Sequence, residues 1–267
     1  MSRTSPIAKV YLFLVFAFLY APIFYLIFYS FNSGGTMSSF DGFTLEHYGA
    51  VFQDNRLMVI VINTVLVALL SALLSSAIGV LGAVGIIFIQ RKKYRQTLLT
   101  MNNILIVSPD VIIGASLLIL FTLIGIKLGF ASVLIAHVAF SVPIVVLMVL
   151  PKLQEMNQSY IDAALDLGAS KRDIFTKVIL PYIQPGVFAG FFLALTYSLD
   201  DFAVTFFVTG NGFSTLSVEI YSMARAGITL TINALSGILF IVTFVLVLGY
   251  YALSNKMKSP IRAGVPK

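Results

Sequence analysis

Residues 159–181 read SYIDAALDLGASKRDIFTKVILP, and an apolar run lies on each side of them, at 131–151 and 184–208. The segment is too polar to cross a lipid bilayer, and its pattern is too regular for a linker. Gly168 can adopt the left-handed conformation that closes a first helix, and the pair Leu180-Pro181 is expected to stop a second helix. The stretch therefore predicts two short helices between two membrane spans.

The starts of these two helices are predicted by serines. Ser159 and Ser170 each precede an aspartate by three positions, which is the spacing of a capping box, in which both side chains satisfy free amides at a helix start. The small residues Ala163 and Ala164 lie on one side of the first helix, so another protein can approach its backbone closely. We interpret the pair of helices as an element that couples this chain to a partner.

The composition outside this segment predicts an integral membrane protein. The chain has 267 residues, of which 59% are hydrophobic and 10% charged, and a mean hydropathy of +0.99, so it has too little polar surface for a soluble globule. Apolar runs near 20 residues indicate helices, because a barrel would show short alternating segments. We predict an all-α, polytopic fold in which a single transmembrane domain, residues 1–267, has six spans at 8–31, 57–90, 97–125, 131–151, 184–208 and 232–254.

Basic residues orient the predicted spans. Fourteen of the 17 lysines and arginines fall on one side, and only Arg56, Lys127 and Arg225 fall on the other. Since cytoplasmic loops of membrane proteins concentrate Lys and Arg, both termini and the loops 91–96 and 152–183 are predicted to be cytoplasmic. Basic residues beside spans also contact membrane lipid, so the net charge of +6 requires no nucleic-acid partner.

Three aspartates, Asp110, Asp200 and Asp201, lie inside stretches apolar enough to cross a bilayer. A carboxylate at the centre of a membrane helix costs roughly 2.5 to 3.5 kcal/mol, so each needs a compensating partner. A cationic solute is one candidate. The alternatives are protonation, hydrogen bonds to neighbouring helices, and a basic residue of a partner subunit.

Helical geometry ranks these acids. In regular helices Asp110 and Asp201 lie at a similar depth, and His137 lies at a comparable one. Adjacent helical residues point about 100° apart, so Asp200 and Asp201 face different directions, and Asp201 lies on the more polar face. We expect Asp110 and Asp201 to accept ammonium groups, with Asp200 as a weaker candidate and the ring of Tyr197 facing the cation. Ordinary packing is the alternative for Tyr197 and His137.

The coupling segment also resembles a known family, the inner-membrane permease subunits of binding-protein-dependent ABC importers. Their pattern is an acidic residue, two alanines, three residues, glycine, nine residues, an aliphatic residue, one residue and Leu-Pro, and Val178 supplies the aliphatic position. The acidic position holds an aspartate, one methylene shorter than the usual glutamate. In that family the segment docks into a cleft of the ATP-binding subunit. The resemblance thus implies that the coupling residues are Asp162, Ala163, Ala164, Gly168, Leu180 and Pro181.

The resemblance covers nearly the whole chain, and the motifs that carry it are similar to those of polyamine permeases in this family. It rests on Ser108-Pro109-Asp110, Leu167-Gly168-Ala169-Ser170, Ser198-Leu199-Asp200-Asp201 and Phe207-Val208-Thr209-Gly210. It implies a type I importer permease (MetI-like) fold in the inner membrane and transport of spermidine, putrescine or both. The implied partners are two copies of an ATP-binding subunit, a second homologous permease subunit and an extracytoplasmic polyamine-binding protein. ATP and Mg²⁺ would bind the ATPase, and this chain would bind no cofactor.

Other functions receive less support. The chain has no cysteine, no Gly-x-x-x-x-Gly-Lys-[Ser/Thr] phosphate loop, no paired-histidine metal motif and no serine with a plausible base, so we expect no catalytic site. Within ABC importers, amino-acid derivatives or iron are alternative solutes. An ion-coupled secondary transporter would show internal repeats with broken helices at matching positions, and a cation channel would need a ring of acids or a carbonyl filter.

Overall fold

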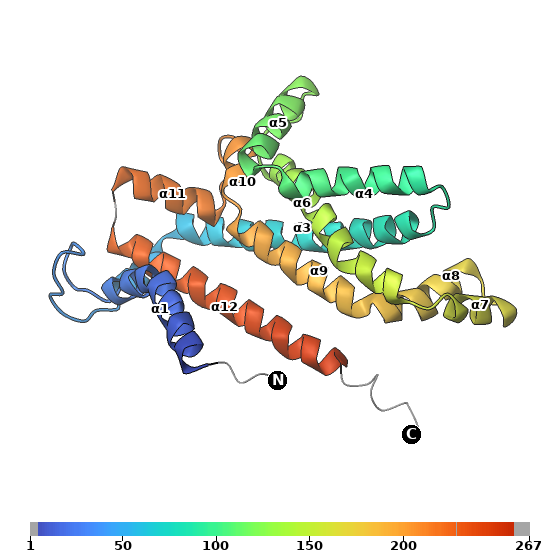
Figure 1. Cartoon of the computed structure of the whole chain (residues 1–267). Coiled ribbons are helices and arrows are strands. Elements are labelled where there is room, and N and C mark those ends of the chain that lie inside the picture. Colours follow the sequence, from blue (N-terminus) through green and yellow to red (C-terminus); the bar gives the residue numbers. More distant parts are fainter. Residues whose placement is uncertain (1–4, 228, 259–267) are drawn as a thin grey trace. The chain divides into compact units, whose positions relative to one another are not determined.

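The computed structural model describes residues 5–227 and 229–258, and this part is almost entirely helical (Figure 1). It contains no strand in that part, beyond one isolated bridge between Asn32 and Phe43. The elements are α1 (Pro6–Tyr29), α2 (Glu46–Gln53), α3 (Asn55–Ile87), α4 (Lys92–Val107), α5 (Asp110–Leu123), α6 (Phe130–Glu155), α7 (Ser159–Asp166), α8 (Lys171–Asp173), the π-helix η1 (Ile174–Ile179), α9 (Leu180–Asp200), α10 (Ala203–Val208), α11 (Leu216–Ala226) and α12 (Leu230–Lys258). The all-helical prediction is confirmed.

Helix length and composition also support the membrane assignment. Within the described residues, 5 helices are long and apolar enough to cross a membrane, and the bent pair of α4 and α5 makes a sixth candidate if it counts as one span. Proline occurs inside three of the apolar helices, α1, α6 and α9. Such residues are tolerated in membrane helices because neighbouring groups satisfy the freed backbone atoms.

The chain divides into two compact units, of which the first comprises residues 1–59 and 219–244. Its loop after α1 is organised by Asn32, a fully buried side chain whose Nδ2 donates to the carbonyls of Thr36 and Ser39. Arg56 donates to both carboxylate oxygens of Glu219 at 2.7 Å. Because Glu219 is buried, this pair compensates a charge that would otherwise be costly.

The second unit comprises residues 60–218 and 245–267, and its core forms where α3, α6 and α9 pack together. Val145 on α6 is fully buried between two glycines. A Cβ on Gly79 would lie 2.7 Å from the Val145 Cβ, and one on Gly190 would lie 3.1 Å from the Val145 Cα. The missing side chains therefore allow close backbone approach, which drives helix association inside membranes.

The third predicted span is broken. Instead of one helix over 97–125, α4 ends at Val107 and α5 begins at Asp110, with an angle of 106° between them (Figure 1). Pro109 lacks an amide hydrogen and disfavours helical geometry in the preceding residue, and Ser108 is extended with ψ of 137°. The regular helix used to estimate the depth of Asp110 was therefore a wrong assumption.

The fifth predicted span is also broken, without proline or glycine. α9 ends at Asp200, Asp201 is extended with φ of −63° and ψ of 118°, and α10 begins at Ala203. The Asp201 carboxylate accepts hydrogen bonds from the backbone amides of Val204 and Thr205, as a residue that caps a helix start does. The assumption that Asp200 and Asp201 share one regular helix was wrong, although the two side chains do differ in exposure, since Asp201 is buried and Asp200 is exposed.

The turn inside the coupling segment matches the prediction. Gly168 has φ of +76°, which lies in the left-handed region that favours glycine. Its amide donates to the carbonyl of Leu165, and the Ala169 amide donates to the carbonyl of Ala164. These two bonds form a Schellman motif, so the expected role of Gly168 at the end of α7 is confirmed.

The two predicted helix starts have different outcomes. Ser170 accepts a hydrogen bond from the Asp173 amide at 3.2 Å, so the second capping serine is confirmed. Ser159 instead is the first residue of α7, and its amide donates to the side chain of Asn157. The prediction of a cap at Ser159 was wrong, because Asn157 supplies the acceptor that the helix start needs.

The expected stop at Leu180-Pro181 was also wrong. α8, η1 and α9 run on as a single helix of 30 residues, Lys171–Asp200. Pro181 lies in the first turn of α9, directly after the π-helical turn of residues 174–179. Proline is tolerated there because its missing amide hydrogen falls next to the turn where the backbone changes its hydrogen-bonding pattern.

Candidate functional site

The two helix breaks meet at one cavity. α5, α9 and α10 converge there (Figure 1), and the cavity has a volume of about 340 Å³. The lining contains three carboxylates and two hydroxyls, with no lysine, arginine or histidine among them. It is therefore a negatively charged hollow without a cation of its own. Its lining residues are Asp110, Leu193, Thr196, Tyr197, Asp200, Asp201, Phe202 and Ala203.

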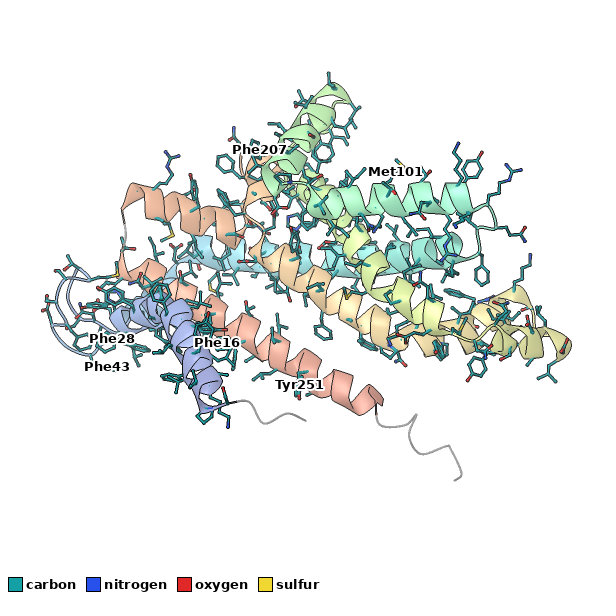
Figure 2. The ribbon with its side chains drawn as sticks, in the orientation of Figure 1. Phe16, Phe28, Phe43, Met101, Phe207 and Tyr251 are labelled. Carbon is teal, nitrogen blue, oxygen red and sulfur yellow. The ribbon has the colours of Figure 1, made fainter. Side chains whose placement is uncertain are left out.

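A glycine brings the third and fifth spans together at this cavity. A Cβ on Gly114 would lie 2.8 Å from the Phe207 ring and 3.0 Å from the Val204 Cα. Phe207 lies on α10 beside α5, as its label in Figure 2 shows. Gly114 stands one helical turn after Asp110, so the close approach of α5 and α10 also carries Asp110 to the cavity.

Asp110 is held at the start of a helix. It is the first residue of α5, and its Oδ1 accepts a hydrogen bond of 2.9 Å from the Tyr197 hydroxyl. A carboxylate is favourable at a helix N-terminus, where the helix dipole is positive. Within the part of the chain that the structure describes, no hydrogen bond or ion pair involves its Oδ2. Asp110 therefore combines a fixed position with one oxygen available to a ligand.

Asp200 stands at the opposite kind of helix end. It is the last residue of α9, its side chain is exposed, and no described residue forms an ion pair or hydrogen bond with its carboxylate. A negative charge at a helix C-terminus is unfavourable, because the dipole and the last carbonyls are also negative there. A bound cation would relieve this repulsion.

Asp201 lines the same cavity, but its oxygens are used inside the protein. Asp201 is only 7% exposed. It accepts hydrogen bonds from the Val204 amide at 3.3 Å, the Thr205 amide at 2.8 Å and the Thr205 hydroxyl at 2.7 Å. Asp201 thus has less capacity to bind a ligand directly than Asp110 and Asp200 have.

Behind Asp201 runs a chain of buried hydrogen bonds. The fully buried His137 has its Nε2 at 2.8 Å from the Thr205 hydroxyl and its Nδ1 at 2.6 Å from the Ser198 hydroxyl. Ser71 donates to Ser198 at 3.0 Å. Because the Thr205 hydroxyl donates to the Asp201 carboxylate, it accepts from His137, and Nδ1 then accepts from Ser198. We assign the Nε2–H tautomer of His137 from this order of donors.

This buried relay ties four helices around the second break. Ser71 lies on α3, His137 on α6, Ser198 on α9 and Thr205 on α10. Sequence reasoning missed Thr205 and Ser71 and left His137 without a partner. Aspartate is one of the residues preferred at a helix cap, so Asp201 carried a usable signal for a helix start, whereas Thr205 and Ser71 carried none.

Tyr197 is positioned from two sides. Its hydroxyl donates to Asp110, and its ring packs edge-on against Phe140 with 5.2 Å between the ring centres. The side chain is partly exposed and lines the cavity. The predicted contact of its ring with a cation stays a prediction.

The coupling segment carries an exposed apolar surface outside the spans. Leu167, next to the Gly168 turn, is 88% exposed, and Tyr160 and Leu165 are also exposed. Asp162 and Ala163 are exposed, while Ala164 packs partly against the core. Leu180 and Pro181 lie inside the long helix Lys171–Asp200.

Comparison with known proteins assigns the family. Residues 75–259 match the family described as binding-protein-dependent transport system inner membrane component. The chain belongs to this family. It is therefore a multi-pass inner-membrane permease subunit, and the resemblance read from residues 162–181 is confirmed. Within the described residues, no group of three His, Cys, Asp or Glu side chains is arranged to hold a metal ion.

Curated relatives cover nearly the whole permease. The spermidine/putrescine transport system permease protein PotC of Haemophilus influenzae is 36% identical over 246 residues, 92% of this chain and 95% of that protein. PotC of Escherichia coli K12 is 38% identical over 88% of each chain. The putrescine transport system permease protein PotI of the same organism is 34% identical over 97% of this chain and 94% of that protein.

Solved structures confirm the fold of the permease. A chain of a bacterial ABC transporter that imports alginate superposes with a TM-score of 0.73, 18% identity and coverage of 93% of this chain and 94% of that one. A chain of the methionine transporter MetNI in an inward-facing conformation gives a TM-score of 0.62 over 73% of this chain and 93% of that one, with 20% identity. Broken spans, which we associated with ion-coupled transporters, thus occur here on an importer permease fold.

Proposed function

We propose that this permease translocates polyamines, spermidine, putrescine or both, as a subunit of an ATP-driven importer. The observation that carries the proposal is the acidic cavity at the two helix breaks, where Asp110 and Asp200 stand without a cation. The relatives named as spermidine/putrescine and putrescine permeases support the same class of solute.

The chemistry of the cavity fits an alkyl amine. A primary ammonium group has three N–H donors, and the carboxylate oxygens of Asp110 and Asp200 can accept hydrogen bonds from them. Leu193 and Phe202 provide apolar surface for a methylene chain, and the Tyr197 ring offers a π-face for a cation. An amino-acid derivative would bring its own carboxylate into an acidic site and be repelled, so this alternative solute is less favoured.

The roles of the aspartates follow from their surroundings. Asp110 and Asp200 contact the ammonium groups in this proposal, whereas Asp201 mainly holds the break and adds negative potential to the cavity. The competing assignment is a direct contact of Asp201 with the solute. The sequence favoured it, because Asp201 was predicted to lie on the more polar face of its helix. The exposed carboxylate of Asp200 supports the first assignment, since its helix end gains most from a bound cation.

The coupling segment is proposed to dock on a cytosolic ATP-binding subunit. Tyr160, Leu165 and Leu167 support this assignment, because three exposed apolar side chains on α7 and the turn after it favour burial against a partner. Asp162 and Ala163 would lie at the same contact. Two such ATPases would bind ATP and Mg²⁺, with a second homologous permease and an extracytoplasmic polyamine-binding protein completing the importer.

One continuous helix offers a physical route for coupling. The helix Lys171–Asp200 begins beside the proposed ATPase contact and ends at the cavity. At 1.5 Å per residue its 30 residues span about 45 Å. We infer that a displacement of the docking end passes along this helix, through the π-helical turn of residues 174–179, to Asp200, and that the Asp200 carboxylate then moves relative to Asp110 on α5.

The proposal is tested by uptake in proteoliposomes that contain the permease with its partner subunits. We expect ATP-dependent uptake of labelled spermidine or putrescine, reduced about 10-fold to 100-fold by Asp110→Asn, because charge-assisted hydrogen bonds contribute about 1.5 to 3 kcal/mol. Asp41→Asn, the same change at an exposed acid outside the cavity, should leave uptake unchanged. Uptake that continues without ATP when ion gradients are kept would contradict an ATP-driven importer.

A further inference from the structure

The permease has a second hollow, which differs from the acidic cavity in its chemistry. It is an apolar groove of about 700 Å³ between α3, α4 and α6. Met101 on α4, labelled in Figure 2, is one of its lining residues. Its one polar side chain is Asn102, whose Nδ2 donates to the Pro143 carbonyl at 3.3 Å. The groove therefore offers almost only hydrocarbon to an occupant.

Two glycines leave this groove open. A Cβ on Gly85 would meet no heavy atom within 4 Å, and one on Gly82 would lie 3.8 Å from its nearest neighbour, Val146. This differs from Gly79 on the same helix, where a Cβ would collide with Val145. Gly82 and Gly85 thus provide room rather than close contact between helices.

At one end the groove continues into a basic pocket. A pocket of about 600 Å³ shares the lining residues Ile89 and Leu98 with the groove. Its other lining residues are Gln90, Arg91, Tyr94 and Thr97. The Arg91 guanidinium lies 5.8 Å from the centre of the Tyr94 ring. Lipid headgroups lie at this level if loop 91–96 is at the membrane surface, as its composition predicts.

The basic residues of this loop have unbalanced charge. Within the described residues, none of Arg91, Lys92, Lys93 and Arg95 forms an ion pair, and no acidic residue occurs between positions 55 and 109. Arg91 lines the pocket at the end of the hydrocarbon groove, and the other three cations are its neighbours in the sequence, so this end is complementary to an amphiphile with a negative head and an apolar tail. A helix from another protein would fill the groove but would not need this charge.

We infer that the groove and the basic pocket form a binding site for an anionic phospholipid. The acyl chain lies between α3, α4 and α6, beside Gly82 and Gly85. The phosphate lies at the rim, where Arg91 and Arg95 compensate its charge. This site is independent of the solute cavity, because it shares no lining residue with it.

The absence of tryptophan from the chain allows a direct test. The full chain with Met101→Trp has a single indole in the groove, and it is reconstituted in vesicles of phosphatidylcholine with brominated phosphatidylglycerol or brominated phosphatidylcholine. We expect the brominated anionic lipid to quench this fluorescence with about 25-fold higher apparent affinity, about fivefold for each of Arg91 and Arg95. Phe18→Trp, on the exposed surface of α1, should show no preference between the two lipids.

Two further variants separate head and tail. Arg91→Gln with Arg95→Gln, in the Met101→Trp chain, should abolish the preference for phosphatidylglycerol while quenching by both lipids persists. Gly85→Leu should reduce quenching by both lipids, because its side chain occupies the open groove. Equal quenching by both lipids before any charge is removed would overturn the inference. Lack of quenching by either lipid would overturn it too, since the groove would then be covered by protein.

Discussion

The break between α4 and α5 and the break between α9 and α10 both deliver an aspartate to one cavity, but they are held by different forces. Pro109 removes an amide hydrogen, so the first break is built into the covalent chain. The second has no proline or glycine and depends on the hydrogen bonds of Asp201, Thr205 and His137. The comparison teaches that a helix break can be encoded locally or only by tertiary packing, and that the second kind is sensitive to single polar substitutions.

Among the substitutions that test how the second break is held, loss of the Asp201 carboxylate should have the largest effect on stability. Asp201→Ala removes three hydrogen bonds and leaves the amides and hydroxyl of residues 204–205 without their acceptor. Because each buried donor left without an acceptor costs about 1 to 3 kcal/mol, we expect the free energy of unfolding in mixed micelles to fall by about 3 to 5 kcal/mol. Asp200→Ala, on the exposed neighbour, should change it by less than about 0.5 kcal/mol. Equal losses in the two variants would contradict the structural role of Asp201.

The next largest loss of stability should come from interrupting the buried relay of hydrogen bonds. His137→Leu leaves the hydroxyls of Ser198 and Thr205 without one partner each, which should lower the free energy of unfolding by about 1 to 3 kcal/mol. His137→Gln keeps an amide near the Nε2 position and should recover part of the loss. If the leucine variant is as stable as the parent chain, the relay does not hold the break.

A substitution at the close contact of α5 with α10 should have the smallest effect on stability. Gly114→Ala places a Cβ 2.8 Å from the Phe207 ring, so overpacking should cost about 1 to 2 kcal/mol and weaken the contact of Asp110 with Tyr197. Gly85→Ala is the matched control, because its new Cβ meets open space on α3. The measurement is thermal unfolding together with spermidine uptake. The same loss in both variants would mean that glycine flexibility, and not close packing, explains the effect.

The sequence predicted those parts of the fold that depend on local chemistry. The apolar runs gave the helices, Gly168 gave the turn after α7, and Ser170 gave a helix start. The break at Pro109 was visible in Ser108-Pro109, but the length of the apolar run favoured one helix. The continuation through Pro181 depends on a π-helical turn, for which no sequence signal was recognised.

The site was predictable in its residues but not in its arrangement. Asp110, Asp201 and Tyr197 line one cavity, and so does Asp200, which helical periodicity had placed on a different face; the contact of these residues with a solute stays a prediction. Their division of roles depends on contacts between residues far apart in sequence, such as Ser198 with His137 and with Ser71. Helical periodicity carries no information on these contacts. It therefore ranked Asp201 above Asp200 on the assumption of a regular helix.

The central claim, that Asp200 binds the solute while Asp201 holds the helix break, is tested most directly by two isosteric substitutions. Asp200→Asn and Asp201→Asn are compared for ATP-driven spermidine uptake in the reconstituted importer, normalised to the amount of folded permease. Asparagine still caps a helix, so Asp201→Asn should retain most of its uptake, whereas Asp200→Asn should lose about 10-fold or more. Full uptake in Asp200→Asn with a severe loss in Asp201→Asn would contradict the account.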